Sequence, residues 1–259
     1  MTLNLERLSL NQVTVNRWSL AEAVDGCARH GLRWIGLWRD RVAEHGLQAS
    51  ARRVRDAGVG VSSLCRGGFF SNADAYDDNR RAIDEAAALG APVLVLVSGP
   101  APDGDLQAAR RRVCEGVAEL LPYAQQAGVQ LGLEPLHPMF AGDRSVVVTL
   151  AEALAVPDVG VVVDVYHVWW DLAVHEQIRR AGARICGLHV SDWLVPPPDH
   201  LLGRGLMGDG VIRIRKLRQE VDAAGYDGPI EVEIFNQALW NMPGDDALEL
   251  LKVRFAEHV

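Results

Sequence analysis

Short apolar runs alternate along this chain with longer stretches of helical periodicity, and this alternation is the feature that most constrains its fold. It is the pattern of successive βαβ units, which build a parallel sheet. Eight predicted strands can be counted: Leu8–Thr14, Trp34–Trp38, Gly60–Leu64, Val93–Val97, Gln130–Glu134, Gly160–Asp164, Ile185–His189 and Pro229–Ile234.

Eight βα units close naturally into a (β/α)₈ barrel. A doubly wound open sheet would usually carry a GxGxxG loop after its first strand, and none follows it here. The length of 259 residues suits one α/β barrel domain, since such barrels run to about 200–250 residues. The sequence therefore predicts an α/β protein, a single (β/α)₈ TIM barrel over residues 1–259.

The net charge of −8 opposes binding to nucleic acid, which generally needs a cationic surface. No apolar run approaches the roughly 18 residues of a membrane span, and the polar start MTLNLERLSLNQ does not read as a signal peptide. The four cysteines are scattered without CxxC spacing, as expected for reduced core residues. We expect a cytoplasmic protein with a small-molecule substrate, no nucleic-acid partner and no membrane.

Four side chains that can bind a metal each stand at the end of a predicted strand: Glu134, Asp164, His189 and Glu233. The carboxyl ends of barrel strands share one rim, so these side chains should meet there. Carboxylate oxygens with one imidazole suit a divalent ion, Mn²⁺ first, with Mg²⁺, Co²⁺ or Zn²⁺ as alternatives. For either glutamate alone, a salt bridge that closes the barrel is the other interpretation.

Glu134 and Glu233 are also candidate acid/base residues. Two glutamates facing each other across a substrate can take a proton from one face of a carbon and return one to the other, beside a carbonyl polarised by the metal. Glu231 lies two residues before Glu233, points to the same side of the strand and competes with it as a ligand.

The two longest irregular stretches, Glu134–Arg144 and Val190–Gly210, follow strand ends, where barrel enzymes place their active sites. They contribute His137 and Trp193 as candidate substrate-binding residues. His167, in the run DVYH, is either a substrate or metal contact or a partly exposed turn histidine; His189 has the alternative of a core histidine. Indole faces near the rim either stack on a sugar or cover the barrel mouth, and the candidates are Trp38, Trp169, Trp170, Trp193 and Trp240.

The runs LEPLHP, DVYH, HVSDW, GRGLMGDG and GYDGPIEVEIF occur in this order at the predicted strand ends. Together they resemble the xylose isomerase-like TIM-barrel superfamily, and within it the sugar (phosphate) isomerases and epimerases such as the ketose 3-epimerases. The resemblance covers essentially the whole chain. It implies one xylose isomerase-like domain over 1–259 and one divalent ion held by the four strand-end residues.

The resemblance also implies roles and a mechanism. Glu134 and Glu233 would double as acid and base, and His167 and Arg204 would bind a carbohydrate substrate, a keto sugar or related polyol. Arg204 stands four residues before Gly208, the first residue of a G-[DE]-G element. Deprotonation next to a carbonyl would give a metal-bound enediolate, and reprotonation would complete the isomerisation.

Alternatives remain at this point. The same carbanion could expel a leaving group, as in a lyase like inosose or dehydroshikimate dehydratase or a C-glycoside-cleaving relative. An endonuclease IV-like site lacks its expected histidines, because the second and third strands end in Trp38-Arg39 and Cys65-Arg66. A non-catalytic sugar-binding barrel is a further reading, and a homodimer is expected only by analogy. Four rim arginines are candidates for binding a substrate phosphate: Arg39, Arg66, Arg144 and Arg204.

Overall fold

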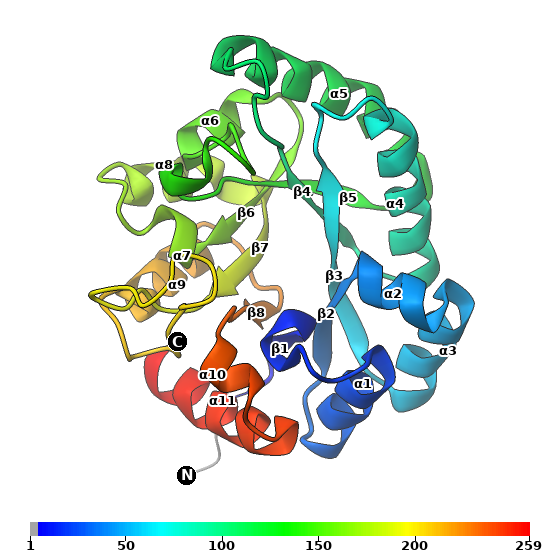
Figure 1. The fold of residues 1–259 in the computed structure, drawn as a ribbon, viewed down its shortest axis with the longest axis vertical. Coiled ribbons are helices and arrows are strands. Elements are labelled where there is room, and N and C mark those ends of the chain that lie inside the picture. The colour runs from blue at the N-terminus through cyan, green and yellow to red at the C-terminus, as the bar shows by residue number, and fades with distance from the viewer. Residues whose placement is uncertain (1–4) are drawn as a thin grey trace.

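The computed structural model describes residues 5–259, so residues 1–4 at the start of the polar N-terminal stretch lie outside the described residues. Eight parallel strands form a closed barrel in the order β1 to β8, which confirms the predicted (β/α)₈ fold (Figure 1). The strands are β1 (Leu8–Asn11), β2 (Trp34–Trp38), β3 (Gly60–Gly68), β4 (Val93–Val97), β5 (Gln130–Glu134), β6 (Gly160–Asp164), β7 (Ile185–Val190) and β8 (Ile230–Val232).

Helices surround the ring of strands (Figure 1). They are α1 (Leu20–Arg29), α2 (Arg39–His45), α3 (Leu47–Ala57), α4 (Ala75–Leu89), α5 (Leu106–Ala127), α6 (Leu150–Ala155), α7 (Val165–Val168), α8 (Val174–Ala181), α9 (Ile214–Ala223), α10 (Gln237–Trp240) and α11 (Gly244–His258), with 3₁₀ turns η1 (Gln12–Val15), η2 (Pro138–Phe140) and η3 (Gly182–Arg184). None of the helices in residues 5–259 is both long and apolar enough to cross a membrane.

Two strands, β1 and β8, are shorter than the sequence predicts, and two, β3 and β7, are longer, β7 by the single residue Val190. β1 ends at Asn11, whose side chain accepts a hydrogen bond from the Val13 N–H and starts η1. β8 ends at Val232, so Glu233 lies one residue beyond it. β3 continues to Gly68, where φ is +101° and a Cβ would lie 1.9 Å from the Val97 carbonyl oxygen. Only glycine allows this close approach to β4.

The main apolar core lies between the barrel and its helices, and a smaller apolar cluster of Cys65, Val95 and Val162 lies inside the barrel. Val162 stands two residues before Asp164 and therefore shares its inward face. β1 alternates leucine with Ser9 and Asn11, which are both fully buried. The barrel interior thus carries a polar layer beneath its carboxyl-terminal rim.

Candidate metal centre and active site

The structure brings the four predicted metal ligands together. Glu134 and Asp164 end β5 and β6, His189 lies in β7, and Glu233 follows β8. One ligand atom from each lies within 4.8 Å of the others, and all four residues are buried. Among residues 5–259 this is the one group of three or more such side chains that could hold a metal ion.

Two atoms of this cluster lack the partners that buried polar atoms normally have. Glu134 Oε1 and His189 Nδ1 lie 3.1 Å apart without the alignment of a hydrogen bond, and neither has another hydrogen-bond partner among the described residues. Leaving such atoms buried and unpaired costs free energy, which an ion between them would recover. The donor set of three carboxylates and one imidazole therefore fits a single divalent ion.

The electrostatics of the cluster follow from its burial. Burial alone would lower the pKa of His189, but the carboxylates around it, Glu231 first, raise that pKa well above its usual value. Burial also raises the pKa of Glu233, and the Arg204 guanidinium offsets part of the rise. A carboxylate whose pKa is raised is a stronger base, which suits proton abstraction near neutral pH.

Arg204 lies at the centre of this network rather than at its edge. Its Nη1 donates to Asp164 Oδ2 at 3.0 Å and to Glu233 Oε2 at 3.1 Å. The guanidinium carbon lies 4.4 Å from the ring centroid of Tyr166 and 4.9 Å from that of Phe235. These two rings and two carboxylates fix the guanidinium in one place, so Arg204 is a buried cation that balances two of the proposed ligands.

His167 is buried, so the alternative interpretation, a partly exposed turn histidine, is wrong. Its Nδ1 accepts a hydrogen bond from the His137 N–H at 3.1 Å, and its Nε2 lies 3.2 Å from Arg204 Nη2. Burial, followed by the charge of Arg204, lowers the pKa of His167 well below its usual value, so the ring is neutral. A neutral imidazole has one acceptor nitrogen, so His167 can satisfy only one of these two donors.

Glu231 does not join the metal cluster. Its Oε2 accepts from Asn11 Nδ2 at 2.9 Å and its Oε1 from Ser62 Oγ at 2.8 Å. Oε2 also lies 3.6 Å from His189 Nε2, the ring nitrogen that faces away from Glu134. A carboxylate in this position orients a ligating imidazole. Asn11 and Ser62 were missed by the sequence prediction; polar residues alternating with leucine in a buried strand were the available signal for Asn11.

Replacing Gly36 by alanine should disturb this orienting carboxylate. A Cβ on Gly36 would lie 2.2 Å from Glu231 Oε2, an oxygen that already accepts a hydrogen bond from Asn11 on β1. We expect a loss of about 1–3 kcal/mol in the free energy of unfolding, measured by urea denaturation, together with weaker metal binding. Gly142→Ala is the control, since nothing lies within 4 Å of its Cβ position. Equal stability of both variants would show that Glu231 moves without cost.

A cavity opens above the cluster, and Glu134, His167, Arg204 and Glu233 are among its lining residues. The rest of its wall comes from segments far apart in the sequence: Trp38, Cys65, Arg66, Val97, Leu136, Phe140, Arg144, Leu201 and Phe235. Cys65, expected to be a core residue, is buried but reaches this wall. Trp38, Arg66 and Arg144 were among the candidates named from the sequence, whereas Val97, Leu136, Phe140, Leu201 and Phe235 were not, because an apolar side chain near a strand end gives no signal of its own.

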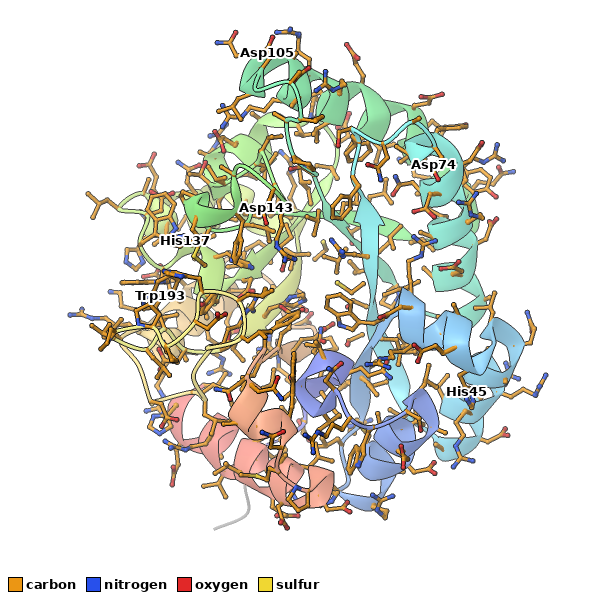
Figure 2. All side chains as sticks on the ribbon, viewed as in Figure 1. His45, Asp74, Asp105, His137, Asp143 and Trp193 are labelled. Atoms are coloured by element: carbon orange, nitrogen blue, oxygen red, sulfur yellow. The ribbon has the colours of Figure 1, made fainter. Side chains whose placement is uncertain are left out.

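His137 and Trp193 stack on each other, with ring centroids 4.8 Å apart, and Figure 2 labels both residues, close together on one side of the barrel. Neither is among the described residues that line the cavity. Burial lowers the pKa of His137 to about 4, so its ring is neutral. Trp193 packs in turn on Tyr166, with ring centroids 5.0 Å apart. Tyr166 lies edge-on to His167, with ring centroids 5.5 Å apart, so the pair is connected to the His167 ring through Tyr166. Direct contact of His137 and Trp193 with substrate stays a prediction.

The loop that carries Arg204 is held by one carboxylate. Asp192 accepts hydrogen bonds from the backbone N–H groups of Gly208 and Gly210, at 3.0 and 2.9 Å. Asp209 of the same GDG element points away to form an ion pair with Arg254 on α11. The backbone of this element therefore fixes the loop, and the fixed loop sets the position from which the Arg204 side chain enters the site.

The family model of the xylose isomerase-like TIM barrel matches residues 24–254 of the chain. A crystal structure of protein SMc04130 from Sinorhizobium meliloti 1021 is 47% identical, with a TM-score of 0.95 over 98% of this chain and 99% of that one. An inosose isomerase of Halalkalibacterium halodurans is 23% identical over 95% of this chain and 94% of its own. The crystal structure of an IolI protein with a bound zinc atom is 19% identical, with a TM-score of 0.83 and 98% of each chain covered. The chain is thus a member of the xylose isomerase-like TIM-barrel family.

Proposed function

We propose that the protein is a divalent-metal-dependent isomerase or epimerase of a keto sugar or related polyol. The observation that carries this proposal is the pair Glu134 and Glu233, two buried carboxylates that line one cavity and meet in one cluster that could hold a metal ion. The name of one relative, an inosose isomerase, supports the same class of reaction. A bound divalent ion would supply Lewis-acid polarisation of the substrate carbonyl.

The chain's own residues supply the proton transfers. One glutamate takes the proton from the carbon next to the carbonyl, and the resulting enediolate is reprotonated by the other glutamate or by the same one. The raised pKa of Glu233 suits it to the first step. Arg204 and His167, both lining the cavity, would orient substrate hydroxyls. The aromatic wall formed by Trp38, Phe140 and Phe235 would limit the access of water to the carbanion.

The test is hydrogen exchange in D₂O, with metal-loaded protein and a panel of keto sugars and cyclic polyol ketones. Deuterium entering the position next to the carbonyl, with a product of unchanged connectivity, supports an isomerase or epimerase. Loss of water or of an aglycone, seen as a lower product mass, would show that the protein is a lyase instead of an isomerase or epimerase. A panel that binds without any exchange would leave only a carbohydrate-binding barrel.

The metal site itself should be measurable without a substrate. After reconstitution with mixed Mn²⁺, Co²⁺, Mg²⁺ and Zn²⁺ and thorough desalting, we expect about one ion per chain by elemental analysis. His189→Ala should lose it, because the imidazole is the only nitrogen donor of the cluster. His45→Ala is the matched control, on the outside of α2 (Figure 2). Equal metal content in both variants would contradict the assignment, and the element retained identifies the ion.

A further inference from the structure

The four rim arginines singled out in the sequence do not have equal freedom to bind a ligand. Arg39 is held by two carboxylates: its Nη1 donates to Asp78 Oδ2 at 2.9 Å and its Nε to Glu85 Oε2 at 2.6 Å. Arg204 is held by two of the proposed metal ligands. The charge of each is therefore already balanced within the protein, which leaves Arg66 and Arg144.

Arg66 and Arg144 both line the cavity that contains Glu134 and Glu233. Within residues 5–259, no carboxylate comes within ion-pair distance of the Arg66 guanidinium. Arg144 has only Asp143, whose Oδ2 lies 3.4 Å from the Arg144 Nε and whose side chain is 65% exposed. The Arg144 Nε is itself buried and makes no hydrogen bond to any described residue.

The two guanidinium groups pack on aromatic rings of one apolar cluster. The Arg66 guanidinium carbon lies 4.3 Å from the ring centroid of Phe69, and that of Arg144 lies 5.6 Å from the ring centroid of Phe140. Phe69 and Phe140 belong to the same apolar cluster, together with Val97 from β4. Packing on an aromatic ring restrains a guanidinium while its edge N–H groups stay available, and these groups match the oxygens of a carboxylate or phosphate.

We infer that Arg66 and Arg144 form an anion subsite, and that the substrate carries an oxyanion, a carboxylate or a phosphate, at the end away from the metal ligands. This inference rests on the proposed function and gives its substrate class. The chain has 34 acidic and 26 basic residues, so carboxylate partners for arginine are plentiful. Two arginines that face the substrate cavity without a buried carboxylate partner complement an anionic keto sugar better than a neutral one.

Two measurements test the subsite on the metal-loaded protein. The first is calorimetric binding of inorganic phosphate and of acetate to the wild type and to Arg66→Gln/Arg144→Gln. The second is deuterium exchange with D-fructose, D-fructose 6-phosphate and 5-keto-D-gluconate, which differ in the anionic group. Arg80→Gln is the matched control, because Arg80 also lies over an aromatic ring, 4.2 Å from the centroid of Tyr123, but is not among the residues that line the cavity.

We expect the double variant to bind at least one of the two anions about tenfold more weakly or worse, with Arg80→Gln unchanged. We also expect kcat/KM for one anionic sugar to exceed that for D-fructose at least tenfold in the wild type, and this ratio to fall toward one in the double variant. The preferred anionic sugar distinguishes carboxylate from phosphate. Unfolding curves of the variants show whether a loss is local.

Two other outcomes are distinguishable. If neutral and anionic sugars exchange equally well and the double variant binds both anions like the wild type, the anion subsite is wrong and the proposed reaction stands. If anion binding depends on both arginines but no keto sugar exchanges hydrogen, the subsite stands and the proposed function fails.

Discussion

Replacing Glu233 or Glu134 by glutamine is expected to lower the rate of substrate conversion by about 10²–10⁴-fold, the usual contribution of a general acid or base. Glutamine keeps the size of the side chain and one oxygen for a metal ion, but it cannot accept or return the proton. Glu134 ends β5 and Glu233 follows β8, two strands that are not neighbours in the barrel, and both side chains line one cavity, so each should serve one face of the substrate. The measurement is conversion rate together with deuterium exchange in D₂O.

The two readouts separate the roles of the two glutamates. Exchange of one hydrogen needs a single base, whereas epimerisation through two faces needs both residues. One variant should therefore retain some exchange while losing conversion. Glu119→Gln, at an exposed position on α5, controls for the change in charge. Metal content is measured in each variant, and full activity of both glutamine variants with metal bound would refute the proton-transfer mechanism.

Arg204→Met is expected to destabilise the metal-free protein by about 3–5 kcal/mol, because it leaves the buried carboxylates of Asp164 and Glu233 without their cation. Methionine keeps much of the apolar stem between Tyr166 and Phe235. A bound divalent ion would compensate the same two charges. Saturating Mn²⁺ should therefore recover more stability in this variant than in the wild type, which urea denaturation with and without the metal measures.

Arg184→Met is the matched control for that experiment. The Arg184 side chain donates only to backbone carbonyls, including Val159 O at 3.0 Å and Val156 O at 2.7 Å. Its loss removes hydrogen bonds but leaves no buried carboxylate unpaired, so its effect should not depend on the metal. If metal shifted the stability of both variants by the same amount, Arg204 would not be coupled to the ligand cluster.

Much of the fold followed from local patterns in the sequence. Seven of the eight predicted strands begin at the predicted residue, and β8 begins one residue later. The predicted strand ends were less accurate where a side chain or a bulge decides the end, as at Asn11 and at the close approach of Gly68 to β4. The candidate ligands were found for a geometric reason: parallel barrel strands end on one rim, so residues that share this position along their strands must meet.

The partners of those ligands were decided only by the tertiary structure. Arg204 reaches Asp164 across 40 residues, and Asn11 reaches Glu231 across 220. The G-[DE]-G element singled out Arg204 as a substrate-binding candidate, but no local pattern showed that Arg204 is bound to two carboxylates and Arg66 to none. The sequence by itself therefore determined the barrel and which residues stand at its rim, because hydrophobic periodicity and strand polarity are local properties. Which arginine is neutralised, which carboxylate orients His189 and which side chains enclose the cavity depended on contacts between distant strands and loops, which exist only once the barrel has closed.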